Sequence, residues 1–413
     1  MSSNHYLYNN LRYNYNKNVL ARYLVIILFF ISPLLSLPFV FVEIYNKRRY
    51  AQTLVALFFA LSAWLFPPIM DLYRHFLSFL KINDNPYALR DLLEDKSDFL
   101  LYYLNRFYGY LGLPFEIVKF TLTFLTYEII FWIFRDIIKK NKSLNKYYFL
   151  IFCIFVLSVH YTNLVTGLRS IFSATLFTLG IYLLVIKQKS GYFFLLSACF
   201  THYTYYFYLI PFIIMIKTNI QISNRNLIIF SLIIITFFNP LLLEKIMNLP
   251  FIPNFISGAM NAYLFGKFSS NQLDTHNFNY FVLYLIGQIP VWILAYYNIF
   301  LSNNNFGRIS RLSLLLLIFL SQVSFILYDR FSAVFLYLSI FAILLYYRKN
   351  LQKILVIIFI SLFISRIGLI YTFRKELSIS YEYTLATPIP WILYHQYTPS
   401  WVFSHIDNEG FIR

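Results

Sequence analysis

A few titratable side chains stand inside or beside long apolar stretches of this sequence, where they could carry chemistry. Arg169 and Arg330 each come at the start of an apolar stretch, and His202 lies inside one. Ionised groups are costly at membrane depth, so a residue of this kind is a functional candidate by default. Guanidinium groups hold phosphate oxygens in a forked geometry, and an unperturbed imidazole titrates near neutral pH. These residue types therefore suit an anionic substrate and a proton transfer.

Further polar residues are candidates for substrate binding: Asp71, Arg74, His75, His160 and Asp329. The first three follow the i, i+3, i+4 spacing that places side chains on one face of a helix. His160 precedes the first candidate arginine, and Asp329 directly precedes the second, which it could orient. We expect all these groups to lie at one depth near the outer ends of their helices.

Each candidate also has a purely structural interpretation. An arginine at a helix end commonly extends to lipid headgroups. A histidine inside a helix bundle can be held by one hydrogen bond, and the face with Asp71 can be simply solvated. The many tyrosines fit an interfacial aromatic belt as well as a sugar-stacking platform.

The sequence contains no Walker loop, no dinucleotide-binding glycine motif and no metal-ligand cluster such as HExxH. We therefore expect neither a cofactor nor a metal, and the driving energy must come from the substrate or from an ion gradient. Two arginines at one depth suit a phosphate or diphosphate group. Nearby Tyr, Asn and His side chains suit sugar hydroxyls.

The composition places these residues in a membrane. Of the 413 residues, 59% are hydrophobic and 12% are charged, whereas soluble domains carry about 25% charged residues. Runs such as Tyr23 to Val42 reach the roughly 20 residues needed to cross a hydrocarbon core as a helix. The net charge of +17 reflects basic turns at helix ends, so we expect no nucleic-acid partner. The predicted fold is all-α, a single transmembrane domain over residues 1–413 with about 11 or 12 transmembrane helices.

The apolar stretches give these predicted spans: 22–42, 50–66, 115–134, 147–165, 168–186, 191–216, 226–243, 279–300, 312–328, 331–347 and 354–372. Basic turns, for example Lys47 to Arg49, should be cytoplasmic. The N-terminus, the loop 67–114, the turn 162–168 and the C-terminal tail 373–413 then lie outside. The amphipathic stretches Asp71 to Ile82 and Phe99 to Leu113 are typical of interfacial helices on the outer face.

Two cytoplasmic turns must be separated by an even number of membrane spans. This rule fails once, between Lys189 and Arg308, where the sequence shows three predicted spans and two or four are needed. One solution is that 191–216 is a broken or re-entrant element around His202. The other is that Ile246 to Phe265, within the second larger loop 244–278, crosses as an extra span. We prefer the second solution, because 191–216 has the length of one tilted span.

Several of these motifs together resemble a known family. Gly167-Leu168-Arg169-Ser170 opens a helix, a basic turn follows at Lys187 to Lys189, and a small-residue stretch ends in Thr201-His202-Tyr203-Thr204. This order is similar to the core of bacterial polysaccharide polymerases of the Wzy/EpsG-like family. Tyr328 to Phe331 and Asp71 to Tyr73 also resemble family features. The sequence departs from the pattern after Arg169, at Ser170-Ile171, and in the aromatic spacing around Asp71.

The resemblance implies a glycosyltransferase at the outer face of the bacterial cytoplasmic membrane. Such polymerases join oligosaccharide repeats carried on undecaprenyl diphosphate. On this basis Arg169 and Arg330 would hold the diphosphates, and His202, or less favourably His75, would be the base for the acceptor hydroxyl. The implied partners are the lipid-linked oligosaccharide, membrane lipids and a chain-length regulator protein. An O-antigen ligase, another lipid-dependent glycosyltransferase and a polysaccharide flippase remain alternatives, and acyl transfer is a weaker one.

Overall fold

The computed structural model describes residues 19–85, 87–93, 99–218, 220–237, 278–301, 304–323, 325–347, 350–372, 384–408 and 410–413. Apart from one isolated bridge between Ile406 and Ile412, the regular structure in these ranges is helical. A helix over Val19–Ile31 is followed by α2 Pro33–Tyr45, α3 Arg49–Leu65, α4 Asp71–Asp84, α5 Ala88–Leu93, α6 Leu100–Tyr110, α7 Glu116–Lys140 and α8 Tyr148–Ser158, the last preceded by the 3-10 helix Lys142–Tyr147. The others are α9 Tyr161–Thr166, α10 Leu168–Val185, α11 Gly191–Thr201, α12 Tyr205–Lys217, α13 Asn224–Phe237, α16 Phe278–Ile299, α17 Asn305–Val323, α18 Phe325–Tyr346, α19 Leu351–Thr372, α21 Ile389–Tyr394 and α22 Pro399–His405.

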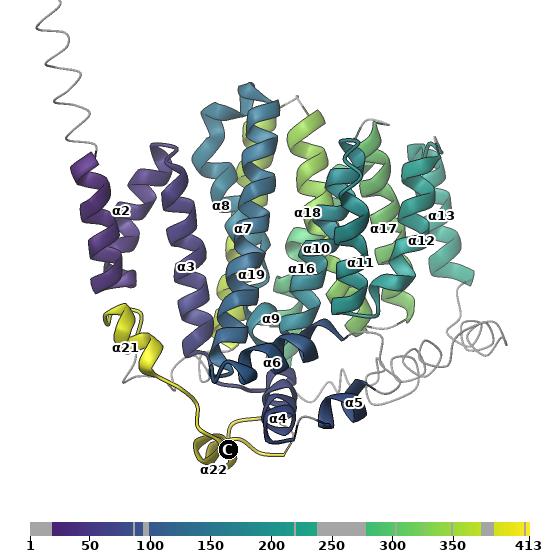
Figure 1. Cartoon of the computed structure of the whole chain (residues 1–413). Coiled ribbons are helices and arrows are strands. Elements are labelled where there is room, and N and C mark those ends of the chain that lie inside the picture. The colour runs from purple at the N-terminus through teal and green to yellow at the C-terminus, as the bar shows by residue number, and fades with distance from the viewer. Residues whose placement is uncertain are drawn as a thin grey trace, which may run out of the picture.

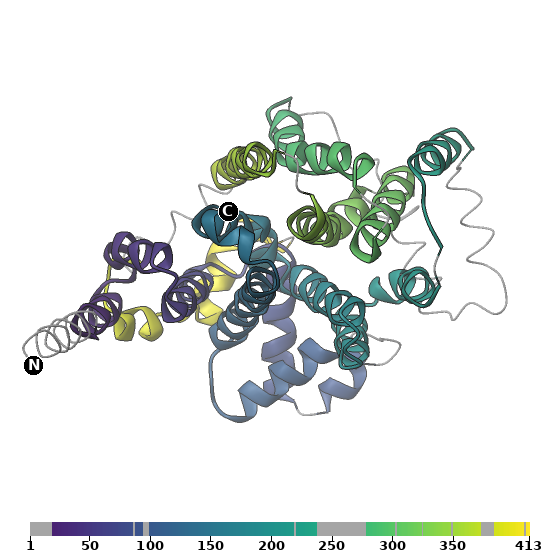
Figure 2. The same ribbon diagram turned by 90° about the horizontal axis from the view of Figure 1, so that it is seen from above.

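The helices form a multi-pass membrane bundle, which confirms the predicted fold class. Five helical segments of the described chain are long and apolar enough to span a membrane: α7, Lys142–Thr166, α10, α18 and α19. Shorter apolar helices, among them α3, α11, α12 and α13, stand beside them (Figure 1). The spans of α10 and α18 are 83% buried, whereas that of α19 is 44% buried, so the first two lie in the interior of the bundle (Figure 2).

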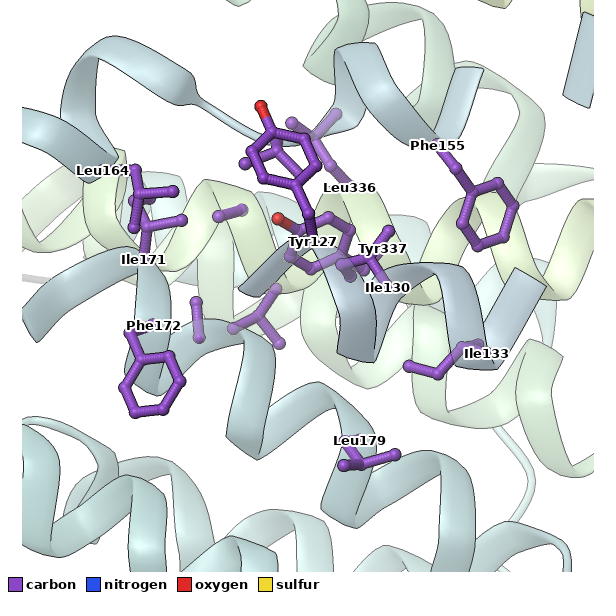
Figure 3. Packing of buried hydrophobic residues seen from close by; sticks show 14 of the residues in the cluster. Tyr127, Ile130, Ile133, Phe155, Leu164, Ile171, Phe172, Leu179, Leu336 and Tyr337 are labelled. Carbon is purple, nitrogen blue, oxygen red and sulfur yellow. The ribbon is translucent and has the colours of Figure 1, made fainter. Parts of the chain in front are cut away.

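Aromatic and aliphatic side chains from α7, α10 and α18 make the core. Tyr127, Ile130 and Tyr337 are buried, and Tyr127 lies near Tyr337 (Figure 3). Without water competing for contacts, van der Waals packing of this kind holds membrane helices together. It fixes α10 and α18, the two helices that carry the candidate arginines.

The bundle has two chemically different ends. Lys47 to Arg49, Lys139, Lys140 and the turn Lys187 to Lys189 lie at one end, which we call the basic end. The helices α4, α5 and α6 lie at the opposite end, at the bottom of Figure 1, which we call the α4 end. Helices form where the amphipathic stretches in the loop 67–114 predicted them.

The segment 191–216 is broken, so the preferred interpretation as one tilted span is wrong. α11 ends at Thr201, His202 adopts an extended conformation, and α12 begins at Tyr205. α11 starts at the basic end beside α10, where Gly180 and Gly191 pack so closely that a Cβ on Gly191 would lie 2.5 Å from the carbonyl oxygen of Gly180.

α12 returns to the basic end. Arg308 in the first turn of α17 donates to the carbonyl oxygens of Thr218 and Ile220, both at 3.2 Å. The two arms therefore form a hairpin with His202 at its tip, and the hairpin restores the alternation of sides. The alternative crossing at Ile246 to Phe265 lies outside the described residues, as does most of the loop 244–278.

Other predicted boundaries also change. The span 22–42 is interrupted at Ser32, where Pro33 begins α2, and 147–165 is interrupted before His160. The expected turn 162–168 is mostly the short helix α9. α18 begins at Phe325, so Asp329 and Arg330 lie within the helix and not in a preceding turn. The first two corrections interrupt a predicted helix, and the last two add local helix where the sequence is less apolar, because hydropathy registers neither kind of detail.

The C-terminal segment packs across the junction between α3 and α4. The Trp64 indole donates to the carbonyl oxygen of His395 at 2.7 Å, and the Tyr397 hydroxyl donates to that of Leu65 at 2.7 Å. Buried Lys119 of α7 donates to the carbonyl oxygens of Trp64 and Phe66 at 3.0 and 2.7 Å. These bonds satisfy the backbone groups left at the end of α3 and fix where α4 starts.

Candidate active site

The α4 end contains a charged cluster centred on Asp71. The Arg74 guanidinium lies 2.8 Å from the Asp71 carboxylate, and His75 Nε2 lies 3.7 Å from it. Arg169, at the start of α10, reaches the same carboxylate at 3.9 Å. One carboxylate thus links the amphipathic helix α4 to the long apolar helix α10, as the helical spacing of the first three residues allows.

The start of α4 is positioned by the C-terminal segment. Met70, which precedes Asp71, has a positive φ of 55° and donates its N–H to the carbonyl oxygen of Gly410 at 2.8 Å. A non-glycine residue in this conformation is strained and persists only where the surroundings fix it. The contact with Gly410 is one such constraint, so Asp71 depends on a segment far away in the sequence.

The second half of the site joins His202 to Arg330. A nitrogen of the Arg330 guanidinium lies 3.0 Å from His202 Nε2, and the Thr204 hydroxyl lies 3.0 Å from His202 Nδ1. A guanidinium is only a donor, so Nε2 accepts from Arg330. On the other side of the ring, Nδ1 also lies 3.3 Å from the backbone N–H of Thr204, which donates to it. Tyr208 of α12 packs on Phe331 of α18 with ring centroids 4.3 Å apart, which holds the hairpin against α18.

The two halves form one site. His202 lies within electrostatic range of Arg330, Arg169, Asp71 and His75. The structure therefore brings together residues from α4, α10, the α11–α12 tip and α18. His202 is only 2% exposed, whereas Arg74 has a side chain 56% exposed, so the cluster runs from the bundle interior to its surface.

The charges of this cluster act on Asp71. Burial by itself raises the pKa of its carboxyl group, but the interaction with nearby His75 and the charges of Arg169 and Arg74 outweigh this and hold the pKa well below its usual range. Asp71 is therefore ionised at neutral pH and stays available to hold the cations around it.

Asp329 and His160 lie in a neighbouring group. Asn163 of α9 donates to the Asp329 carboxylate at 3.1 Å, and Arg366 of α19 exerts its charge on both Asp329 and His160. His160 is buried and precedes α9. These two predicted residues therefore support the region where α9 leads into Arg169, and they do not join the cluster around Asp71.

Arg366 and Asn163 were not among the predicted site residues. Arg366 donates from Nε to the carbonyl oxygen of Leu157 at 2.7 Å and from Nη2 to that of Ser158 at 3.4 Å, so it satisfies the end of α8. Its position inside an apolar stretch is the signal that could have revealed it. Asn163 has no comparable signal, because only the fold brings it to Asp329.

The arrangement can bind an anion and move a proton. Arg169 and Arg330 supply fixed positive charge, and His202 offers a basic nitrogen once Arg330 leaves it. Among the described residues, no group of three or more His, Cys, Asp or Glu side chains is arranged to hold a metal ion. The guanidinium and imidazole groups present suit electrostatic stabilisation together with acid–base catalysis.

Comparison with known proteins gives one result. The model of the EpsG family matches residues 73–385, which include Arg169, His202 and Arg330. Asp71 and the C-terminal segment beyond 385 lie outside the matched region. No curated protein and no solved structure matches the chain.

Proposed function

The chain belongs to the EpsG family, the family of Wzy-like polysaccharide polymerases, and from this premise we propose that it joins lipid-linked oligosaccharide repeats by glycosyl transfer. The proposed substrates are repeats carried on undecaprenyl diphosphate at the outer face of the bacterial cytoplasmic membrane. The observation that carries the proposal is the meeting of Arg169, Arg330 and His202 at the α4 end.

The proposed reaction uses these groups in sequence. An acceptor hydroxyl attacks the anomeric carbon of the donor sugar, and the bond from that carbon to the diphosphate oxygen breaks. The electron pair leaves with the diphosphate, whose charge Arg169 and Arg330 stabilise. As Arg330 turns to the diphosphate, it releases Nε2 of His202, which accepts the hydroxyl proton.

Asp71 and Asp329 have positioning roles in this proposal. The Asp71 carboxylate lies 3.9 Å from the Arg169 guanidinium and holds it from one side. Asn163 donates to the carboxylate of Asp329, the residue directly before Arg330, and so fixes its position. Arg74, whose side chain is 56% exposed, extends the positive charge from Asp71 outward, where a second diphosphate or the sugar chain could lie, and buried His75 supports Asp71 from the inside. His160 contributes indirectly, through the support of α9.

The test is a reaction in vitro. The protein, reconstituted into vesicles, receives lipid-linked repeats isolated from a strain that lacks it, and chain length and released undecaprenyl diphosphate are measured. A polymerase gives a ladder of products with one diphosphate released per added repeat. A single transfer to a different acceptor would indicate a ligase, and transbilayer movement without a new bond would indicate a flippase.

The proposed side of action has its own test. Tyr87, at the α4 end, is 83% exposed, and Lys189, at the basic end, is exposed as well. A cysteine at position 87 should react with an impermeant thiol reagent on intact cells, and one at 189 only after the membrane is opened. The opposite pattern would place the α4 end in the cytoplasm.

A further inference from the structure

A cavity remote from the candidate active site opens near the basic end between α7, α10 and the start of α11. Its volume is about 450 Å³, and its lining includes Leu125, Glu128, Ile129, Trp132 and Arg135 of α7. These positions follow helical spacing, so one face of α7 forms a continuous wall. Trp132 and Leu125 are 39% and 40% exposed, although α7 is a long helix inside the bundle.

The cavity is amphiphilic along its length. Leu179 and Leu183 of α10 face the apolar side chains of α7, so its deeper part suits hydrocarbon. Arg49, at the start of α3, and Arg135 line it as well. The apolar part of the cavity therefore leads to the two arginine side chains, which lie near the basic end of the bundle.

The guanidinium of Arg135 is held in place by neighbouring side chains. One nitrogen of its guanidinium donates to the Gln52 amide oxygen at 2.8 Å, and Gln52 in turn donates to the Tyr148 hydroxyl at 2.7 Å. Glu128 lies 3.7 Å from the other end of the guanidinium. Two arginines and one glutamate leave the lining with a net positive charge, and Lys187 and Lys189 flank its residue Gln188 in the sequence.

We propose that this cavity binds an anionic phospholipid of the leaflet at the basic end, with its phosphate between Arg49 and Arg135 and the upper part of one chain against Trp132. Basic pockets between transmembrane helices recognise lipid phosphates in this way, because guanidinium groups hold phosphate oxygens and the surrounding walls accept hydrocarbon. The volume is within the range of pockets that hold small ligands. A peptide would leave its backbone groups without partners against these apolar walls.

Trp132 provides a direct reporter for the test. The purified full-length protein is reconstituted in phosphatidylcholine vesicles containing increasing fractions of phosphatidylglycerol with brominated chains, which quench nearby tryptophan fluorescence. The signal of Trp132 is the difference between the original protein and Trp132→Phe. We expect half-maximal quenching at a several-fold lower fraction of brominated phosphatidylglycerol than of brominated phosphatidylcholine.

A matched pair of variants separates a site from general surface charge. Arg48 and Arg49 are adjacent and both exposed, but only Arg49 lines the cavity. We expect Arg49→Gln to weaken the preference for phosphatidylglycerol about fivefold and Arg48→Gln to leave it unchanged. Equal effects of the two variants, or equal quenching by both lipids in the original protein, would overturn the proposal.

Inorganic phosphate distinguishes the lipid from a free anion. In vesicles that contain brominated phosphatidylglycerol, millimolar phosphate should not relieve the quenching of Trp132, because it lacks the chain that contacts the apolar wall. Relief by phosphate alone would show a site for a free anion and contradict a lipid site. None of these measurements depends on polysaccharide synthesis, so the proposal stands or falls separately from the proposed enzymatic activity.

Discussion

Arg330 lies 3.0 Å from Nε2 of His202, across 128 residues of sequence, and this contact occupies the nitrogen that a general base would use. In the proposed mechanism, the site is therefore closed to proton transfer until this contact opens. A diphosphate that attracts Arg330 would open it, so binding of the leaving group and availability of the base are coupled in the proposed mechanism.

Replacing His202 by Gln separates catalysis from structure. Gln keeps a donor and an acceptor, so a purely structural histidine should be replaceable at little cost, whereas loss of a general base typically costs about 10² to 10⁴ in rate. We expect single repeats at a normal protein level, measured as chain-length distribution in a deletion strain. His405→Gln, an exposed histidine of α22, is the control. Normal chains from His202→Gln would exclude His202 as the base.

The substitution Arg169→Lys tests whether the forked geometry of the guanidinium matters in addition to its charge. If its guanidinium holds the diphosphate through a fork, Arg169→Lys should lose most polymerisation despite the retained charge, and Arg169→Ala nearly all. Arg90→Lys, on the exposed surface of α5, should be neutral. Full activity of Arg169→Lys, at equal amounts of protein in the membrane, would reduce Arg169 to a general positive charge.

Arg366 should be important for stability. Its replacement by Met keeps an unbranched apolar stem but removes the donors to the carbonyl oxygens of Leu157 and Ser158. A buried acceptor left without a donor costs about 1 to 3 kcal/mol, so the thermal unfolding temperature in detergent should fall. Cys153→Ser, in the preceding turns of α8, serves for comparison. An unchanged unfolding temperature of Arg366→Met would show that these carbonyl groups find other donors.

The low pKa of Asp71 gives a stability effect with a defined sign. Its pKa is lower in the folded than in the unfolded chain, so the stabilisation is fully present above the unfolded value, about 4. It is lost as the pH falls through the folded value. The difference in unfolding temperature between the original protein and Asp71→Asn should therefore be constant from about pH 6 to 8 and shrink below about pH 4. A difference that changes between pH 6 and 8 would show that Asp71 titrates there.

Gly410 should control how α4 is held. Its φ is +88°, and an added Cβ would lie 3.0 Å from the backbone nitrogen of Met70. We expect Gly410→Ala to loosen the start of α4, so that a cysteine at the buried position Leu72 reacts faster with maleimide. Gly112→Ala has similar backbone strain, at φ +68°, but meets no atom within 4 Å, and so provides the control. Equal reactivity in the two variants would show that the Met70 contact is not needed.

The sequence was sufficient for the class of fold, and it supplied the candidate residues of the site. Apolar stretches with basic ends specify membrane helices, and α3 and α10 match their predicted spans within about a turn. The site residues were found because ionisable groups are rare at membrane depth.

The details that failed depend on contacts between distant segments. The break between α11 and α12 at His202 is stabilised by contacts with Thr204 and Arg330. Hydropathy averaged over a window of residues does not reveal such a break. Asp329 binds Asn163, 166 residues earlier, through a contact that has no sequence pattern. The support of Asp71 by Gly410 likewise exists only in the folded chain.

The hairpin of α11 and α12 also restricts how the chain can vary in length. Both of its arms are fixed at the basic end, one by the Gly180–Gly191 contact and the other by Arg308, while His202 lies at the free tip. Deleting one residue from α11 would withdraw the tip by about 1.5 Å and turn it by about 100°. His202 would then face away from Arg330. An insertion or deletion in α11 should therefore abolish the His202–Arg330 contact unless α12 changes in length by the same amount. The lengths of the two helices together set the depth of the imidazole in the bundle.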